Sequence, residues 1–193
     1  MYVSTYKYKN KGCLFMKIME AMKELAMDVN DKMIDMMEAG ATMELAQDLL
    51  STRLYNAVYN IVEKDLDLKE YYNWGLDSTL DDSTRGEFTG YSIKINRLNA
   101  PAAHLIRALY EDDKENERYE YNMALTVLST MAHEMRHAWQ RENNVYDLND
   151  YISSDENYDD YYNQDSEVDA RNYQNKFFTR ELYNALVEAI NKR

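Results

Sequence analysis

Residues 130–142 read TMAHEMRHAWQRE, and this stretch holds two of the three histidines of the chain. It closes a helix predicted over residues 117–141, because apolar residues recur there every three or four positions. One side of this helix carries Leu128, Met131, Met135 and Ala138, and Leu125 and Trp139 extend the apolar surface around it. A helix covered on more than one side is typical of the centre of a domain. We therefore expect the fold to be organised around this helix.

His133 and His137 are four residues apart, so both imidazoles project from one face of the helix. Two nitrogens at that spacing can bind one Zn²⁺ with bonds of about 2.0–2.1 Å. Glu134 lies about 100° around the helix from His133, where it can reach a water at the metal but is badly placed as a ligand. The pattern H-E-x-x-H is typical of ligand, base and ligand. The alternative is an ordinary helix whose two histidines lie on the surface or bond within the core.

A zinc site of this kind needs a third protein ligand. His104 and Cys13 both lie upstream of the motif, whereas SEVDARNYQNKFF opens a predicted helix that follows it, from near Ser166 toward Ile190. This helix offers two carboxylates, Glu167 and Asp169. Glu167 and Ala170 are three residues apart and share one face of that helix. The small Ala170 lets the helix pack close to the motif helix, which brings the Glu167 carboxylate to the metal.

The succession of HEMRHAWQ and EVDARNY resembles the gluzincin metallopeptidases, and most closely the minimal-gluzincin and ImmA/IrrE-like group. In that group an H-E-x-x-H helix is followed by a helix bearing E-x-x-A-[N/D]-x-[F/Y]. The resemblance covers about residues 85–180. It implies that the catalytic base is Glu134 and that the zinc ligands are His133, His137 and Glu167.

Three further positions in the second helix bear on this resemblance. Tyr173 matches the aromatic position, and Arg171 stands where the family has Asn or Asp. Asp169, two residues before Arg171, is the candidate for a carboxylate that contacts a ligand imidazole. Such outer partners fix the orientation of metal-binding histidines.

The expected fold class is α+β and predominantly helical. GYSIKINRL (residues 90–98) alternates, with Ile93 and Ile95 on one face, and predicts a strand paired with a neighbour around EFTG (residues 87–90). The resemblance implies a zincin-like core: a small antiparallel sheet, the H-E-x-x-H helix and the third-ligand helix. In this family an edge strand lines the cleft and pairs with the substrate backbone, and the strand GYSIKIN fits that place.

The N-terminal third of the chain lies outside the resemblance. Helical periodicity predicts three more helices, over residues 14–38, 43–64 and 101–110. No linker divides the sequence. We therefore expect a single domain over residues 1–193, with an N-terminal helical part (1–70) and a zincin-like catalytic part (71–193).

The net charge of the chain limits the classes of partner that it can bind. Its 193 residues carry a formal net charge of −13, which disfavours binding to nucleic acid or to an anionic membrane. No window approaches the roughly 18 uninterrupted apolar residues of a membrane span. A single cysteine, Cys13, excludes an internal disulfide and is typical of a reducing compartment. We expect a cytoplasmic protein whose partner is a peptide or protein substrate, without nucleic acid or membrane.

An acidic segment rich in tyrosine, residues 143–165, joins the two helices of the motif. Its D-x-N-x-D pattern starts like a calcium loop, but Asp160 stands where glycine is required and Ser166 where glutamate is required. The segment is therefore expected to be either a solvated acidic loop or a flap that covers the site. Zinc peptidases of this kind often add a tyrosine or histidine that stabilises the oxyanion. The sequence offers His104 and many tyrosines, including Tyr146, Tyr158 and Tyr161, and does not choose among them.

Two functions follow from these features. The first is a zinc-dependent metalloendopeptidase, in which Glu134 assists the attack of zinc-bound water on a peptide bond. The second is a non-catalytic, zinc-containing structural or binding protein of phage or mobile-element origin, in which the zinc holds two helices together. Chain size and expected cytoplasmic character are similar to those of proteins encoded by phages and mobile elements. Glu134 favours the first, because a structural zinc site has no need of a carboxylate at that position.

Overall fold

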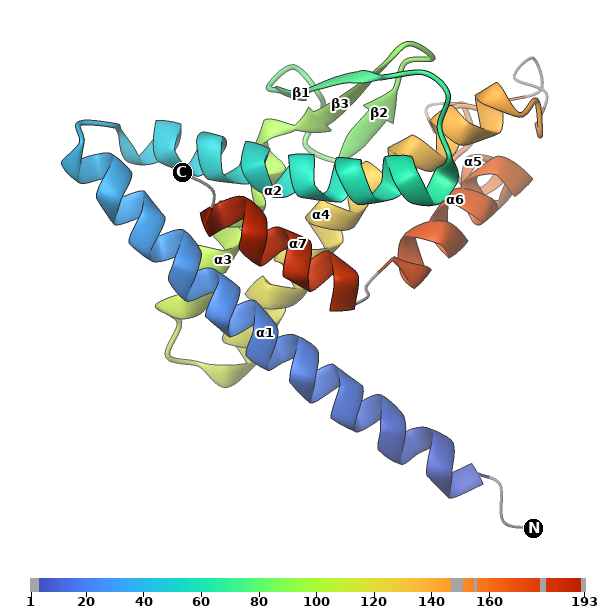
Figure 1. The fold of residues 1–193 in the computed structure, drawn as a ribbon. Helices are drawn as coiled ribbons and strands as arrows, with labels where there is room; N and C mark the ends of the chain where they lie inside the picture. Colours follow the sequence, from blue (N-terminus) through green and yellow to red (C-terminus); the bar gives the residue numbers. More distant parts are fainter. Residues whose placement is uncertain (1–3, 147–150, 155, 178–179, 192–193) are drawn as a thin grey trace.

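The computed structural model describes residues 4–146, 151–154, 156–177 and 180–191, and these are mostly helical around one small sheet (Figure 1). The elements, in chain order, are α1 (Ser4–Glu38), α2 (Met43–Leu66), β1 (Asn73–Asp77), β2 (Gly86–Phe88), β3 (Ser92–Asn96), the 3-10 turn η1 (Arg97–Asn99), α3 (Pro101–Leu109), α4 (Lys114–Glu142), α5 (Tyr158–Asn163), α6 (Asp165–Lys176) and α7 (Arg180–Asn191). The α+β class and the helical character are as predicted.

The first two helices form a hairpin. The turn uses Gly40 at φ 99°, a conformation that favours glycine, and the Thr42 hydroxyl then accepts a hydrogen bond from the Leu45 N–H at 3.2 Å to cap α2. α1 begins ten residues earlier than predicted, and its N-terminal half extends away from the other elements (Figure 1). Among the described residues, none of the helices combines the length and the apolar character that a membrane crossing requires.

The sheet has the order β1-β3-β2, with β3 parallel to β1 and antiparallel to β2. The prediction of a purely antiparallel sheet is therefore wrong, and so is the placement of residues 92–96 at an edge. Ile93 and Ile95 of this central strand are fully buried, which stabilises the fold by about 1.5–3 kcal/mol for each side chain. The edge strand that packs on α4 is β2.

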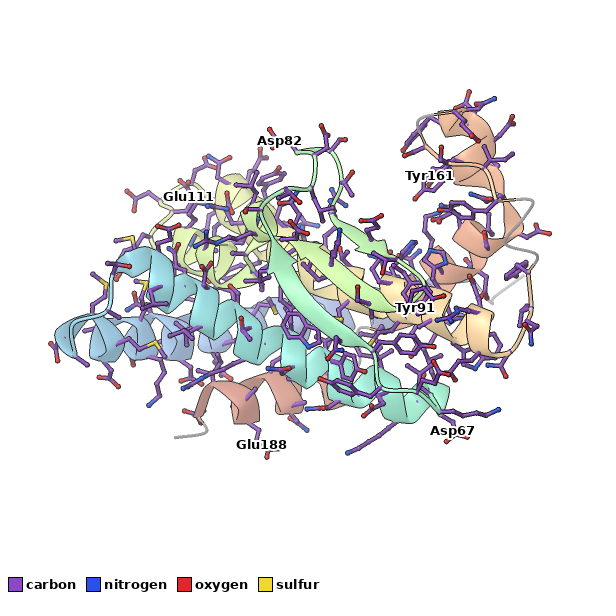
Figure 2. All side chains as sticks on the ribbon, turned by 90° about the horizontal axis from the view of Figure 1, so that it is seen from above. Asp67, Asp82, Tyr91, Glu111, Tyr161 and Glu188 are labelled. Atoms are coloured by element: carbon purple, nitrogen blue, oxygen red, sulfur yellow. The ribbon has the colours of Figure 1, made fainter. Side chains whose placement is uncertain are left out.

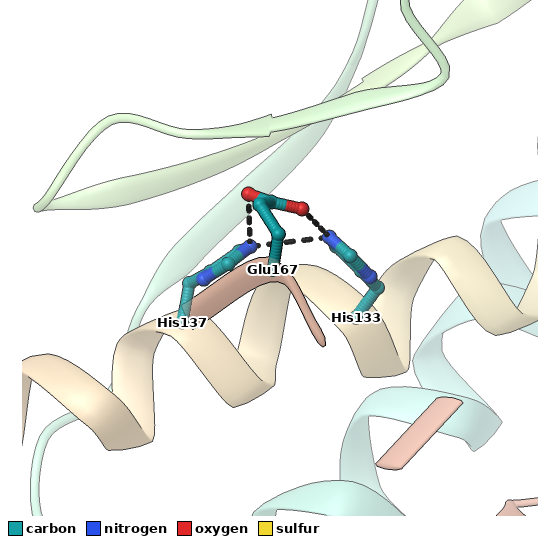
Figure 3. Close-up of side chains that lie close together, drawn as sticks. All are labelled: His133, His137 and Glu167. Atoms are coloured by element: carbon teal, nitrogen blue, oxygen red, sulfur yellow. Dashed lines mark hydrogen bonds and ion pairs between the residues drawn. The ribbon is translucent and has the colours of Figure 1, made fainter. Parts of the chain in front are cut away.

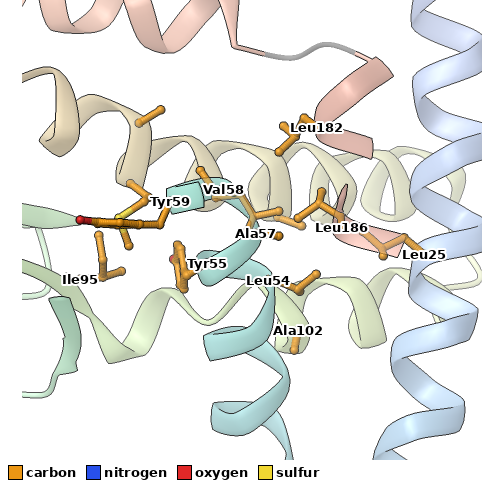
Figure 4. Packing of buried hydrophobic residues seen from close by; sticks show 14 of the residues in the cluster. Leu25, Leu54, Tyr55, Ala57, Val58, Tyr59, Ile95, Ala102, Leu182 and Leu186 are labelled. Atoms are coloured by element: carbon orange, nitrogen blue, oxygen red, sulfur yellow. The ribbon is translucent and has the colours of Figure 1, made fainter. Parts of the chain in front are cut away.

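The core lies between α4, α2 and the sheet, and α3 and α7 extend it (Figure 4). Leu128, Met131 and Met135 of α4 are completely buried, in agreement with the predicted central helix. Buried side chains from residues 1–70 and from residues 71–193 belong to one continuous cluster. α4 is therefore held on several sides by the core, and its C-terminal half, which carries His133 and His137, continues from this packed part.

Glu142, at the end of α4, fixes the connection that leads into the sheet. Its carboxylate accepts hydrogen bonds from the backbone N–H groups of Lys69 and Glu70, both at 3.0 Å. This holds the chain between α2 and β1 against α4, so that the sheet lies over the helices, as the view from above shows (Figure 2).

The predicted helix over residues 166–190 is two helices, α6 and α7. Phe177 ends α6, and residues 178–179 lie outside the described part of the chain. The two helices bury their apolar faces against different partners, because α6 packs on α4 whereas α7 packs on α2 and α1. One straight helix cannot satisfy both sets of contacts, and periodicity alone does not reveal the change of partner.

Candidate metal centre

Two elements bring the predicted ligands together. α4 presents His133 and His137 from successive turns, and α6 crosses it with Glu167 in its first turn (Figure 3). Ala170 is completely buried, as expected for a residue at which two helices approach closely. Farther along α6, Gln174 donates a hydrogen bond to the Ser129 hydroxyl of α4 at 2.7 Å. The close approach of the two helices at Ala170, rather than this distant hydrogen bond, sets the position of Glu167 relative to the two histidines.

The three side chains converge on one point. Nε2 of His133 lies 3.2 Å from Oε2 of Glu167, Nε2 of His137 lies 3.1 Å from Oε1, and the two Nε2 atoms are 3.1 Å apart. A tetrahedral zinc ion with bonds of about 2.0–2.1 Å separates its ligand atoms by about 3.3 Å. The observed separations differ from this by only a few tenths of an ångström. Within the described residues, these three form the group that can hold a metal ion.

The charge of the site also suits a cation. Glu167 is only 1% exposed. Burial works to raise the pKa of its carboxyl, but the hydrogen bonds from His133 and His137 outweigh burial and hold that pKa well below its usual range. Burial works to lower the pKa of His137, and the Glu167 carboxylate instead raises it. A buried anion faced by two imidazole nitrogens is a donor set of the kind that Zn²⁺ binds.

Glu134 is buried on the same helix but lies outside the ligand group and faces β2. Burial raises the pKa of its carboxyl, while His133 and His137 lower it, and a hydrogen bond from the Phe88 backbone also favours the ionised form. The edge strand therefore holds the carboxylate beside the ligand histidines. A carboxylate with a raised pKa next to a metal site is suited to accept and return a proton.

The contact between Glu134 and β2 requires glycine at position 86. A Cβ atom on Gly86 would lie 2.7 Å from Cγ2 of Thr130 and 3.0 Å from Oε1 of Glu134, both closer than van der Waals contact allows. We expect Gly86→Ala to push β2 away from α4 and to lower the free energy of unfolding by about 1–3 kcal/mol. Urea denaturation measures this. Gly75→Ala is the matched control, since nothing lies within 4 Å of the corresponding position, and an equal loss there would contradict the assignment.

The outer partner of the His137 ring is Gln140, which the sequence did not single out. Oε1 of Gln140 lies 2.8 Å from Nδ1 of His137. Asp169, predicted to contact a ligand imidazole, instead accepts a hydrogen bond from Nε2 of Gln140 at 2.9 Å and reaches the ring only through that amide. Asp169 also pairs with Arg136 through two hydrogen bonds, of 2.8 and 3.2 Å. The Arg136 guanidinium packs over the Trp139 ring at 3.7 Å.

Two tyrosines of the acidic segment form hydrogen bonds with Glu167, the predicted third ligand. The Tyr151 hydroxyl donates to Oε1 of Glu167 at 3.0 Å, and Tyr161 also forms a hydrogen bond with Glu167. Their rings meet edge to face, with centroids 6.2 Å apart. Tyr161 is among the tyrosines named from the sequence. Tyr151 was not named, because no spacing rule distinguishes it among the many tyrosines that the sequence offers.

The other candidates for an oxyanion donor lie elsewhere. His104 contacts Glu120 at 2.7 Å, and 13 residues of α4, or about 20 Å of helix, separate Glu120 from His133. Tyr158 is 63% exposed, and Tyr146 is near Asp169 rather than the ligands. Residues 147–150 and 155, which include the first position of the calcium-like pattern, lie outside the described residues.

In α6, both the residue that departs from the family pattern, Arg171, and the residue that matches it, Tyr173, make structural contacts. Arg171, in place of Asn or Asp, lies 3.7 Å from Oε2 of Glu167, donates a hydrogen bond to the Tyr162 carbonyl and packs over the Tyr162 ring. It therefore joins the third ligand to α5. The Tyr173 hydroxyl donates to Asp65 of α2 at 2.8 Å and ties α6 to the N-terminal hairpin.

Comparison with known proteins identifies no relative of this chain. No protein-family model, no curated protein and no solved structure matches the chain. The resemblance to gluzincins therefore stands on the two short motifs alone. What the chain does has to be inferred from the chemistry of the site formed by His133, His137, Glu167 and Glu134.

Proposed function

We propose that the protein is a zinc-dependent metallopeptidase of the gluzincin type. The observation that carries the proposal is the convergence of His133, His137 and Glu167 at separations suited to zinc, with the buried carboxylate of Glu134 next to the first ligand on the same helix. A purely structural zinc site uses four protein ligands, whereas three leave a position for water or substrate. The group of three ligands that the described part of the chain offers, together with a nearby base, favours catalysis over a structural role.

The residues of the chain divide the chemistry among them. When bound by His133, His137 and Glu167, zinc would supply a Lewis acid that polarises the peptide carbonyl and makes water a stronger acid. Glu134 accepts the proton of the attacking water and returns it to the leaving amine. Because burial raises the pKa of Glu134, its carboxylate is a stronger base than an exposed glutamate and is suited to take that proton.

The edge of β2 suits an extended peptide as substrate. β2 pairs with β3 on one side only, and its three residues, Gly86–Phe88, run past Glu134. An extended segment can add to such an edge through main-chain hydrogen bonds that are indifferent to sequence. The resemblance assigned this edge position to the strand GYSIKIN, residues 90–96, and β2 takes that role in our proposal. The scissile bond would then pass beside Glu134.

The Tyr151 hydroxyl is the donor best placed to assist the reaction. Its contact with Oε1 of Glu167 puts an O–H group at the metal centre. We expect Tyr151→Phe to keep its zinc and to lower kcat roughly 10²-fold with a smaller change in KM, as for loss of one oxyanion donor. Steady-state kinetics measure this. Tyr158→Phe, in the same segment but exposed, is the matched control, and equal kinetics for Tyr151→Phe and the wild type would contradict this role.

Two measurements on the wild type test the proposed function. Elemental analysis of the purified protein should give about one zinc per chain, and a library of unstructured peptides should be cleaved, with activity lost to a chelator and restored by zinc. One zinc without cleavage anywhere in the library would favour the non-catalytic zinc protein. Absence of zinc at micromolar concentrations would contradict both functions.

A further inference from the structure

Gln140 occupies an unusual place for an amide side chain. It is 4% exposed and lies one turn after His137 on α4, beneath the metal-binding face. Its Oε1 is 2.8 Å from Nδ1 of the His137 ring, the nitrogen that does not face Glu167. Burying an amide side chain costs free energy unless both its oxygen and its nitrogen form hydrogen bonds. The partners of Nε2 therefore determine which way round the amide lies, and hence which atom faces His137.

Those partners fix the orientation of the amide. Nε2 of Gln140 lies 2.8 Å from the carbonyl oxygen of Ser166 and 2.9 Å from Oδ2 of Asp169. A carbonyl and a carboxylate only accept hydrogen bonds, so both need the N–H groups of the amide. The reversed amide would place its oxygen against two other oxygens. The oxygen of Gln140 must therefore face His137, and Nδ1 of His137 must donate.

We propose that Gln140 is a positioning residue of the metal centre: it holds Nδ1 of His137 as an N–H group and so presents Nε2 to the metal. That Nε2 atom lies 3.1 Å from both Oε1 of Glu167 and Nε2 of His133. The same amide bonds to Ser166 and Asp169, which flank Glu167 in α6. One side chain thus sets the ring of the second ligand and the register of the helix that carries the third. The proposal rests on the zinc site proposed above.

The two histidine ligands differ in this respect. Nδ1 of His133 is buried and has no hydrogen-bond partner among the residues that the structure describes. Among the described residues, Nδ1 of His137 therefore has an acceptor of fixed orientation and Nδ1 of His133 has none. Loss of Gln140 should therefore act on His137 and leave His133 as it is.

The test compares two glutamines that both join α6 to α4. Gln140→Leu removes the contact to His137, whereas Gln174→Leu removes the hydrogen bond of Gln174 to Ser129, which does not involve a ligand. Zinc affinity is measured by competition with a chromophoric chelator, and the Nδ1 proton of His137 by ¹H–¹⁵N NMR of histidine-labelled protein. We expect Gln140→Leu to weaken zinc binding about 10- to 100-fold and to lose the slowly exchanging Nδ1 proton, while Gln174→Leu keeps both.

The outcomes separate this role from general helix packing. Unchanged zinc affinity in Gln140→Leu, or an equal loss in both variants, would overturn the proposal. The wild-type spectrum is a test even where a variant does not fold, because the absence of a protected Nδ1 proton on His137 also overturns it. If the wild type takes up no zinc, the proposed function fails, and protection of that proton in the metal-free protein still decides whether Gln140 holds the ring.

Discussion

Glu134→Gln is expected to abolish peptide hydrolysis while leaving zinc binding intact. The amide has the shape of the carboxylate but cannot accept a proton from water at neutral pH, so the loss should match that of a general base, roughly 10²–10⁴-fold in kcat. Glu134 is not among the ligand atoms, and its neighbours on the ligand face are untouched. The measurement is kcat on a peptide identified in the library, together with zinc content of the same sample.

The environment of Glu134 makes this variant easy to interpret. Burial raises the pKa of the carboxyl, which means that the folded protein disfavours the ionised form relative to the unfolded chain. Above the ordinary pKa of glutamate this destabilises the metal-free fold, and glutamine removes the cost. The variant should therefore be no less stable than the wild type, so lost activity cannot be attributed to unfolding.

A matched control and a contradicting result complete the experiment. Glu115→Gln changes an exposed glutamate in the first turn of the same helix and should leave kcat unchanged. Glu134→Gln with wild-type kcat would remove Glu134 from the mechanism. Equal inactivity of wild type and variant across the library would favour the non-catalytic zinc protein.

The helices could be predicted because their signals are local. The apolar positions of α4, such as Leu128 and Met131, recur with helical spacing and are buried wherever the helix packs. The sheet depends on pairing between distant residues. β1, with the sequence NWGLD, pairs in parallel with β3 at the register Trp74↔Ile93, and nothing in its own sequence indicates this partner. The order β1-β3-β2, and hence the edge at the site, followed only from the structure.

The three residues of the candidate metal site could be predicted for a similar reason, whereas the residues that contact them from outside could not. The spacing of His133 and His137 is set by one helix, and Glu167 shares a helix face with the small residue Ala170. Gln140 and Tyr151 act through contacts that depend on how α6 and the acidic segment fold back on α4. Gln140 did carry a weak signal, because it lies three residues after His137 on the same helix.

Glu167→Ala is expected to remove zinc, whereas Asp169→Ala only weakens its binding. Glu167 supplies an oxygen within 3.2 Å of each histidine ligand atom, and the other two ligands cannot replace it. Asp169 touches Gln140 and Arg136 but no ligand ring, so its loss should cost about 10- to 100-fold in affinity, as for outer partners of metal ligands. The loss in Glu167→Ala should exceed that range. Chelator competition and zinc content after dialysis measure both variants.

Stability gives an independent readout of the same difference. A ligand that binds only the folded state stabilises it by about 2.7 kcal/mol at a concentration 100 times its Kd. Zinc should therefore raise the Tm of the wild type, raise that of Asp169→Ala only at higher concentration, and leave that of Glu167→Ala unchanged. Glu167→Gln, which keeps the size of the side chain but removes its charge, separates lost ligation from a cavity, and it too should fail to respond. Full zinc retention in Glu167→Ala would contradict the third ligand, because the helix α6 would then have no part in the site.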